Sequence, residues 1–182
     1  MSSTPYETTS VAIPGGTVVV VVDPDDGAVV ASGFADLATT FGFLSAAERA
    51  RGYREVEPTE PSVQPAVEAL HDYADGDLAA LDRVAVRQHG GPFLQVAWDA
   101  LREVKAGETD SYAGLAVRAR RPSAVRAAGQ ACARNKVAPF VPCHRILRTD
   151  GSLGGYAYGL PVKEALLVHE GVRRAGEATL FA

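Results

Sequence analysis

The sequence predicts an α+β fold, with a small N-terminal sheet-plus-helix domain and a mainly helical C-terminal domain that carries a winged-helix-like helix-turn-helix. The first observation is "TVVVVVDPDDGAVVASGF", residues 17–34, in which two β-branched runs flank an Asp/Pro/Gly turn, as in a β-hairpin. The second is a change of composition at "HGGPF", residues 89–93, after which short helical segments take over. We therefore divide the chain into an N-terminal scaffold domain, 1–88, and a C-terminal domain, 89–182.

The elements of the first domain follow in order. A polar N-terminal tail precedes the hairpin, and "ATTFGFLSAAERARG", residues 38–52, favours a helix that ends at Gly52. A proline-containing connection follows. Apolar residues at helical spacing then predict a helix over about 62–73, and "RVAVRQ", residues 83–88, is a candidate last strand.

The second domain begins with a helix at 92–104, where Pro92 occupies a natural first position. Two more helices, at 111–119 and 122–135, are separated by a short Arg-Arg-Pro turn, and this arrangement is typical of a helix-turn-helix. The apolar stripe expected to bury the first helix consists of Phe93, Val96, Ala97, Leu101 and Val104, with Trp98 in the core.

The last third of the chain alternates between turns and one helix. "APFVPCHRIL" is β-like until Pro142, where a turn is expected, and a glycine-rich loop follows at 148–161. The segment "PVKEALLVHEG" predicts a final helix with Pro161 inside its start and Gly171 past its end. Glu170 is thereby placed in the C-terminal turn of that helix.

Composition limits the class of protein. Of 182 residues, 47% are apolar and 22% charged, as in a globular protein, and no apolar run approaches the roughly 18 residues of a membrane span. The two cysteines, Cys132 and Cys143, favour free thiols in a reducing compartment. No CxxC or HExxH motif occurs. We therefore expect a soluble cytoplasmic protein with no metal and no membrane partner.

Charge is distributed unevenly along the chain. Residues 1–100 carry five arginines against fifteen acidic residues, a net charge of −10, whereas residues 101–182 carry thirteen basic against seven acidic residues, a net charge of +6. The overall charge of −4 hides this difference. A polyanion such as nucleic acid would be attracted to the second part.

The stretch "VPCHRIL" raises a question of chemistry, because Cys143 and His144 are adjacent. Neighbours in an extended strand point to opposite faces, but a turn starting at Pro142 would change their directions. A thiol with a pKa near 8.5 needs a base to become a nucleophile, and His144 oriented by Glu170 would supply one. From spacing alone, a buried structural cysteine remains the alternative.

The motifs "PCHR", "GGYAYGL" and "KEALLVHEG" closely resemble the active-site signature of the O6-alkylguanine-DNA alkyltransferases, the methylated-DNA–protein-cysteine methyltransferases. The resemblance extends upstream through "PFLQVAWDALREVKAGETDSYAGLA" and "PSAVRAAGQACARN", and covers about residues 90–171. It implies direct-reversal DNA repair, in which one molecule transfers one alkyl group, chiefly methyl, from O6 of guanine in double-stranded DNA without a cofactor. It also implies that the target base is flipped out from the minor groove and that the protein acts as a monomer.

The resemblance implies roles for individual residues. Cys143 would accept the alkyl group, His144 would be its base through a water, and Glu170 would orient His144. Tyr112 would donate a hydrogen bond or proton to the leaving guanine, and Asn135 belongs to a structural turn before the active-site segment. Arg126 would enter the duplex in place of the flipped base. The remaining implied DNA contacts are Ser123, Ala124, Arg121, Arg118, Arg134 and Lys136, and the implied substrate pocket consists of Val141, Pro142, Tyr156, Ala157 and Tyr158.

Three positions depart from the family pattern. Lys136 stands where a proline usually follows Asn135, Ala157 replaces a serine or glycine, and Tyr158 occupies a normally small position. A bulky phenol at Tyr158 narrows a pocket, so we expect methyl adducts to be accepted better than benzyl adducts. Three other classes remain as alternatives: a non-enzymatic protein that binds alkylated DNA, a sequence-specific helix-turn-helix regulator, and a cysteine hydrolase. The presence of Cys143 argues against the first.

Overall fold

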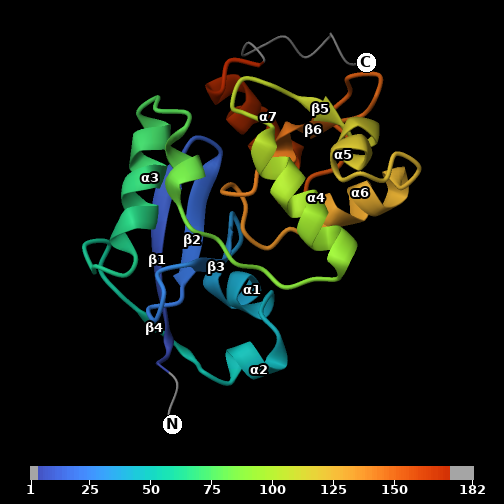
Figure 1. Cartoon of the computed structure of the whole chain (residues 1–182). Coiled ribbons are helices and arrows are strands. Elements are labelled where there is room, and N and C mark those ends of the chain that lie inside the picture. The colour runs from blue at the N-terminus through green and yellow to red at the C-terminus, as the bar shows by residue number, and fades with distance from the viewer. Residues whose placement is uncertain (1–3, 173–182) are drawn as a thin grey trace. The chain divides into compact units, whose positions relative to one another are not determined.

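The computed structural model describes residues 4–172, and its mixture of a four-stranded sheet, a two-stranded sheet and several helices confirms the α+β class (Figure 1). The chain forms two compact units. Within the described residues, the N-terminal unit consists of 4–88 together with 136–140, and the C-terminal unit of 89–135 together with 141–172. Residues 1–3 and 173–182 of the two expected domains lie outside the described part.

The N-terminal unit is built on a four-stranded sheet of order β3-β2-β1-β4 (Figure 1). The expected hairpin is present as β2, Gly16–Val22, and β3, Val29–Gly33, which pair antiparallel. Val18, Val20, Val21 and Val22 are all fully buried, so β2 is covered on both faces.

The expectation of a polar N-terminal tail was wrong. Residues of that segment form β1, Tyr6–Ile13, which pairs antiparallel with β2 from Glu7 to Ile13. The polar Glu7 and Thr8 are buried in it, and such residues hide a strand from a hydrophobicity pattern. The proline-containing connection also holds a short strand, β4, Tyr53–Glu55, parallel to β1.

Helices pack against this sheet. The single helix expected at 38–52 is two short ones, α1, Leu37–Gly42, and α2, Ala46–Arg49, because Ser45 and Glu48 form a capping box that starts a new helix. Phe41 of α1 packs against a core cluster of Tyr6, Val21, Val30, Ala31 and Leu44. The helix expected near 62–73 is α3, Gln64–Ala74, which packs against β1, and a 3₁₀ turn, η1, Ala80–Arg83, follows.

Two further segments extend the N-terminal unit beyond its strands. Residues 83–88 do not form the expected strand and make a single bridge, between Val86 and Val29. Residues 136–140 return from later in the chain and meet Ser32, whose N–H donates to the Lys136 carbonyl (2.8 Å) and whose hydroxyl donates to the Ala138 carbonyl (2.9 Å). This connection belongs to the N-terminal unit although active-site residues flank it in sequence.

The C-terminal unit is mainly helical. It contains α4, Pro92–Glu103; α5, Tyr112–Arg118; α6, Val125–Ala133; and α7, Leu160–His169. Helix α4 packs against α5 and α6, and Trp98 is 3% exposed, as expected, with its indole N–H donating to the Ala131 carbonyl (2.9 Å). The predicted stripe on α4 is wrong at Val96, which is exposed. Two short parallel strands, β5, Asp110–Ser111, and β6, Ile146–Leu147, join the start of α5 to the active-site segment.

No helix within residues 4–172 is long and apolar enough to cross a membrane. Within the same residues, no group of three or more His, Cys, Asp or Glu side chains is arranged to hold a metal ion.

Candidate active site

The candidate site is built around a 3₁₀ turn, η2, Cys143–Arg145, which begins directly after Pro142. A 3₁₀ helix has three residues per turn, so the side chains of neighbouring residues point about a third of a turn apart. Cys143 lies at the pocket described below, whereas the His144 side chain is completely buried. The turn expected at Pro142 therefore does separate the two neighbours.

His144 contacts a buried carboxylate at the end of α7. Its Nε2 lies 2.8 Å from Oε1 of Glu170, the C-terminal cap residue of that helix. The next residue, Gly171, has a φ of +77°, the left-handed conformation that ends a helix. The expected proximity of His144 and Glu170 is thus confirmed, because the end of α7 places the Glu170 carboxylate beside the imidazole.

Arg145 completes a buried network around Glu170. Its Nε donates to Oε2 of Glu170 (3.0 Å) and its Nη2 to Oε1 (2.9 Å), a bidentate pairing. Its Nη1 donates to the Val104 carbonyl (2.7 Å) at the end of α4. Sequence reasoning assigned no role to Arg145, because its pairing depends on burial that the motif does not reveal.

The charges of this network follow from its contacts. Burial opposes ionisation of Glu170, but His144 and Arg145 outweigh it and lower the pKa of Glu170 to about 2. Burial lowers the pKa of His144, although Glu170 partly opposes that shift. A neutral His144 facing an ionised Glu170 carries its proton on Nε2. Its Nδ1 is then a buried acceptor, and it has no hydrogen-bond partner within the described chain.

The Cys143 thiol is held by an amide. Asn135, just after α6, donates through Nδ2 to Cys143 Sγ (3.2 Å) and to the Val141 carbonyl (2.7 Å). Burial raises the pKa of Cys143, while the hydrogen bond from Asn135 and the positive charge of Lys163 act in the opposite direction. Asn135 therefore contacts the Cys143 sulfur itself, in addition to the structural turn expected of it.

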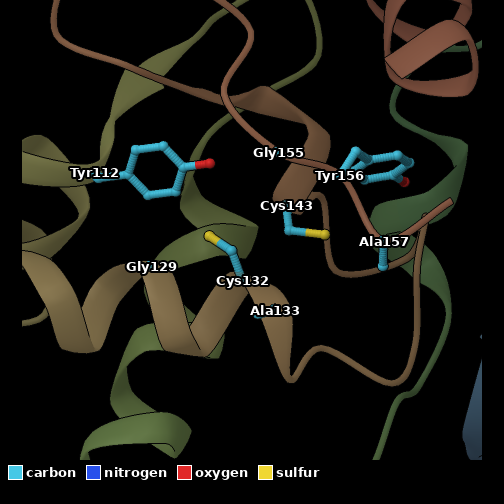
Figure 2. A pocket seen from close by; sticks show the side chains of 8 residues that line it. All are labelled: Tyr112, Gly129, Cys132, Ala133, Cys143, Gly155, Tyr156 and Ala157. Carbon is cyan, nitrogen blue, oxygen red and sulfur yellow. The ribbon is translucent and has the colours of Figure 1, made fainter. Parts of the chain in front are cut away.

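A pocket of about 330 Å³ opens over Cys143. One wall comes from α6, where residues 129, 132 and 133 follow the i, i+3, i+4 spacing of a single helix face. Figure 2 shows the thiols of Cys132 and Cys143 and the Tyr112 ring around this space. The lining residues are Tyr112, Gly129, Cys132, Ala133, Cys143, Gly155, Tyr156 and Ala157.

The lining agrees with only part of the expected substrate pocket. Tyr156 and Ala157 line it, whereas Val141, Pro142 and Tyr158 do not. Val141 is buried, and its carbonyl binds Asn135 instead. The Tyr158 ring packs edge-to-face against Tyr156, with centroids 5.5 Å apart. Sequence reasoning predicted only a free thiol at Cys132 and missed its place in the pocket.

Tyr112 is positioned by the start of α5. Ser111 caps that helix by accepting from the Gly114 N–H (2.9 Å), which fixes Tyr112 as the first helical residue. Its ring lies against the glycine-rich loop, since a Cβ added to Gly154 would lie 2.9 Å from the hydroxyl oxygen. Burial, followed by the nearby Cys132 and Cys143 thiols, raises the pKa of Tyr112, so its hydroxyl keeps its proton.

A buried lysine holds the glycine-rich loop, a feature that the sequence pattern concealed within an apolar helix. Lys163 of α7 is fully buried, and its Nζ donates to three backbone carbonyls. Ile146 accepts at 2.6 Å, Gly155 accepts at 3.4 Å, and Leu153 also accepts. Because Gly155 lines the pocket, the ammonium group links the active-site strand to the pocket wall.

The expected DNA contacts differ in their surroundings. Arg121, Ser123, Arg126 and Arg134 are exposed on or near α6, and Ala124 is half-buried. The Arg121 guanidinium lies 6.0 Å from the Phe93 ring centroid.

Two of the residues expected to contact DNA make contacts within the protein instead. Arg118 binds Asp110 (2.6 Å) and lies 3.8 Å from Glu103. Lys136 belongs to the N-terminal unit, where its N–H donates to Gln88 Oε1 (3.0 Å).

Comparison with known proteins supports a common origin for this arrangement. Residues 92–172 match the family model of the 6-O-methylguanine DNA methyltransferase, DNA binding domain. The methylated-DNA–protein-cysteine methyltransferase of Salmonella typhimurium is 41% identical over 123 residues, which cover 68% of this chain and 71% of that protein. The bifunctional transcriptional activator and DNA repair enzyme Ada of Escherichia coli is 49% identical over 81 residues, 44% of this chain and 23% of that protein.

Solved structures extend the similarity to nearly the whole chain. The O6-methylguanine methyltransferase of Mycobacterium tuberculosis is 28% identical, with a TM-score of 0.72, and the match covers 98% of this chain and 99% of that one. A structure of the same organism's protein in complex with DNA is 26% identical, also with a TM-score of 0.72, over 97% and 99% of the two chains. On this sequence identity and coverage, the chain belongs to the methylated-DNA–protein-cysteine methyltransferase family of DNA repair enzymes.

Proposed function

We propose that this enzyme repairs O6-alkylguanine in double-stranded DNA by moving the alkyl group, chiefly methyl, onto Sγ of Cys143. The observation that carries the proposal is a thiol at the wall of a pocket of about 330 Å³ with a buried His144–Glu170 pair behind it. The resulting thioether is stable, so each molecule reacts once. The reaction needs no cofactor, and one chain suffices.

His144 is the base that takes the thiol proton. Its Nε2 is occupied by Glu170, so the remaining acceptor is Nδ1, which is buried and has no hydrogen-bond partner within residues 4–172. A water between Cys143 and Nδ1 passes the proton. The imidazolium that forms is stabilised by the ionised Glu170, which Arg145 keeps in place.

The transfer step is an in-line displacement at carbon. The Cys143 thiolate attacks the alkyl carbon, a new carbon–sulfur bond forms, and the bond between that carbon and guanine O6 breaks. The electron pair of the broken bond stays on the guanine. The protonated Tyr112 hydroxyl donates a hydrogen bond or proton to the leaving base, as a general acid in this position does.

Asn135 holds the Cys143 thiol in position. Its amide contact to Sγ and its second contact to the Val141 carbonyl fix the sulfur relative to the active-site turn. A hydrogen bond to sulfur also favours the thiolate over the thiol. Asn135 thus supports the nucleophile, and the proton leaves by way of His144.

The target base reaches the pocket by flipping out of the duplex, because guanine O6 lies inside the helix. Arg126 on α6 is exposed and fills the vacated position in the stack. Binding is from the minor groove, whose degenerate pattern suits repair in any sequence. Contacts to the DNA backbone come from α6 and the segments next to it, through Arg121, Ser123, Ala124 and Arg134. Arg118 and Lys136 contribute less to these contacts.

Adduct size is limited by the tyrosines of the glycine-rich loop. Tyr156 lines the pocket and Tyr158 packs edge-to-face against it, so a large adduct must displace both rings. Methyl transfer is therefore faster than benzyl transfer. Equal or faster benzyl transfer from the same DNA context would contradict this preference.

The test is intact-protein mass measurement after incubation with a duplex containing one O6-methylguanine. The expected product is a gain of one methylene, located on the peptide that contains Cys143. Cys143→Ser is expected to bind the same duplex without a gain in mass, and Cys132→Ser serves as a matched control for loss of a thiol. Tight binding with unchanged mass would instead indicate a non-enzymatic lesion-binding protein.

A further inference from the structure

The two cysteines of this chain lie at the same pocket, although only one of them has a role in alkyl transfer. Cys132 belongs to the last turn of α6 and is half-buried, and Cys143 belongs to the 3₁₀ turn. Figure 2 shows both thiol side chains among those that surround the cavity. The second thiol therefore lines the space that, under the proposed function, the substrate base enters.

One residue connects the two cysteine segments. The Asn135 N–H donates to the Cys132 carbonyl (3.3 Å), and its side-chain amide donates to Cys143 Sγ (3.2 Å) and to the Val141 carbonyl (2.7 Å). The end of α6 and the active-site turn are thus joined through a single asparagine. The placement of both cysteines at one pocket is consequently fixed by the fold of the C-terminal unit.

The two thiols also influence each other electrostatically. Burial raises the pKa of Cys132, and a negative charge on Cys143 raises it further. When Cys143 ionises, Cys132 therefore keeps its proton. The Cys143 sulfur in addition accepts a hydrogen bond from the Asn135 amide, which favours its thiolate. The pair consequently divides into one nucleophilic thiol and one neutral thiol.

We propose that Cys132 and Cys143 form a redox pair in which hydrogen peroxide or a related peroxide produces an internal disulfide that reversibly blocks alkyl transfer. The Cys143 thiolate attacks one peroxide oxygen, giving a sulfenic acid and releasing hydroxide. The Cys132 sulfur then attacks the sulfenic sulfur, a sulfur–sulfur bond forms, and the oxygen leaves as water. Overall, two thiols lose two hydrogens and one peroxide becomes two waters. A dithiol reductant reverses the change.

The disulfide protects the Cys143 thiol, which peroxide would otherwise oxidise irreversibly. Without a partner thiol, a sulfenic acid is oxidised further to sulfinic acid, which most cells do not reverse. Disulfide geometry requires the two Cα atoms to come within about 7 Å, so formation of the bond is itself a stringent measure of proximity. That blocking the sulfur stops repair rests on the proposed role of Cys143 as alkyl acceptor.

The experiment exposes the full chain to a small molar excess of hydrogen peroxide under non-reducing conditions. The expected intact mass is lower by two hydrogens, with a cross-linked peptide joining Cys132 to Cys143. Methyl transfer to the protein falls to the level of Cys143→Ser and returns after dithiothreitol. Chain that has already been methylated on Cys143 is expected to show no such loss of mass.

The variants Cys132→Ser and Cys132→Ala test the role of the second thiol. The transfer activity of each variant after oxidation is compared with its own activity before oxidation. We expect both variants to gain oxygen atoms under peroxide and to recover less of their initial transfer activity after dithiothreitol. An unchanged or oxygen-bearing wild-type mass, a cross-link between chains, or equal recovery in the variants would overturn the proposal. Disulfide formation in a protein that transfers no methyl group would instead contradict the proposed function and leave the redox pair intact.

Discussion

At the scale of single residues, the proposed chemistry depends on one carboxylate that is almost completely buried and yet ionised. Glu170 is 3% exposed, and it receives a bidentate contact from Arg145 as well as the contact from His144. Burial of a lone carboxylate would cost several kcal/mol, so the paired arginine is what allows the charge to persist. An ionised Glu170 in turn orients the imidazole.

Glu170→Gln tests this arrangement. The amide cannot stabilise an imidazolium and leaves the buried Arg145 without a counter-charge. We expect the methyl-transfer rate at saturating DNA to fall by about 100-fold or more, and the free energy of unfolding to fall by about 3 kcal/mol. Single-turnover kinetics and urea denaturation measure the two effects.

The same substitution has a defined pH signature. The folded pKa of Glu170, about 2, is below its ordinary value of 4.5, so its stabilisation is complete above pH 4.5 and is lost as the pH falls toward 2. The stability difference between the wild type and Glu170→Gln should therefore shrink over that interval. Glu164→Gln on the same helix is the matched control, and an equal effect there would show that the loss is not specific to the network.

The pH dependence of methyl transfer reports on His144. An ordinary histidine with a pKa of 6.5 would be half protonated at that pH, but burial lowers the pKa of His144 and keeps the base neutral. The rate is expected to stay constant as the pH falls through 6.5 and to decline only at lower pH. A decline centred at or above pH 6.5, with the fold intact by circular dichroism, would contradict a neutral buried base.

At the scale of elements, α7 supports the wall of the pocket through Lys163. Three backbone carbonyls surround its ammonium group, and one of them belongs to the pocket residue Gly155. A buried cation is stable only with such partners, and the carbonyls equally depend on the cation. The glycine-rich loop is therefore held by a side chain from the helix that follows it.

Lys163→Met retains the length of the side chain and removes the charge. It leaves the three carbonyls without their donor and takes away a positive charge that favours the Cys143 thiolate. We expect a loss of about 3 kcal/mol in the free energy of unfolding and a slower methyl transfer. Faster hydrogen exchange at residues 153–156 would locate the change, whereas the exposed Lys105→Met should alter none of these quantities.

The elements that sequence patterns predict are those whose burial follows a simple period. The hairpin β2–β3, the helices α3 and α4, and the capped α7 were all expected, because valine runs, apolar stripes and capping residues are local signals. The strands β1 and β4 were missed. Glu7 in β1 is buried because Arg54 and Ser62 bind its carboxylate, and such a contact across 47 or more residues has no local signature.

The candidate site shows the same limit. Cys143, His144 and Glu170 were expected together from their motifs, and the structure joins His144 Nε2 to Glu170, while the Cys143 sulfur contacts Asn135. Arg145, Lys163 and Cys132 contribute through burial and shared space. Those properties arise from tertiary packing, so spacing could not reveal them.

At the scale of the whole molecule, the uneven distribution of charge predicts how the enzyme meets DNA. The second part of the chain, residues 101–182, carries a net charge of +6, but a positive residue contributes to DNA affinity only if its charge is available. Arg134 is exposed after α6, and no ion pair within the described chain involves it. Arg118 is paired with Asp110 in the same unit.

This difference gives a matched pair of variants. Each phosphate contact releases about one counterion, so Arg134→Ala should reduce the slope of log affinity against log salt by about 1. Arg118→Ala removes the same charge but should change the slope much less, because that arginine already neutralises Asp110. Fluorescence anisotropy with an undamaged duplex across a salt series measures both slopes. Equal changes in the two slopes would mean that Arg118 exchanges its carboxylate partner for a phosphate on binding DNA. The salt dependence of DNA affinity would then follow the number of basic residues rather than their ion pairs in the free protein.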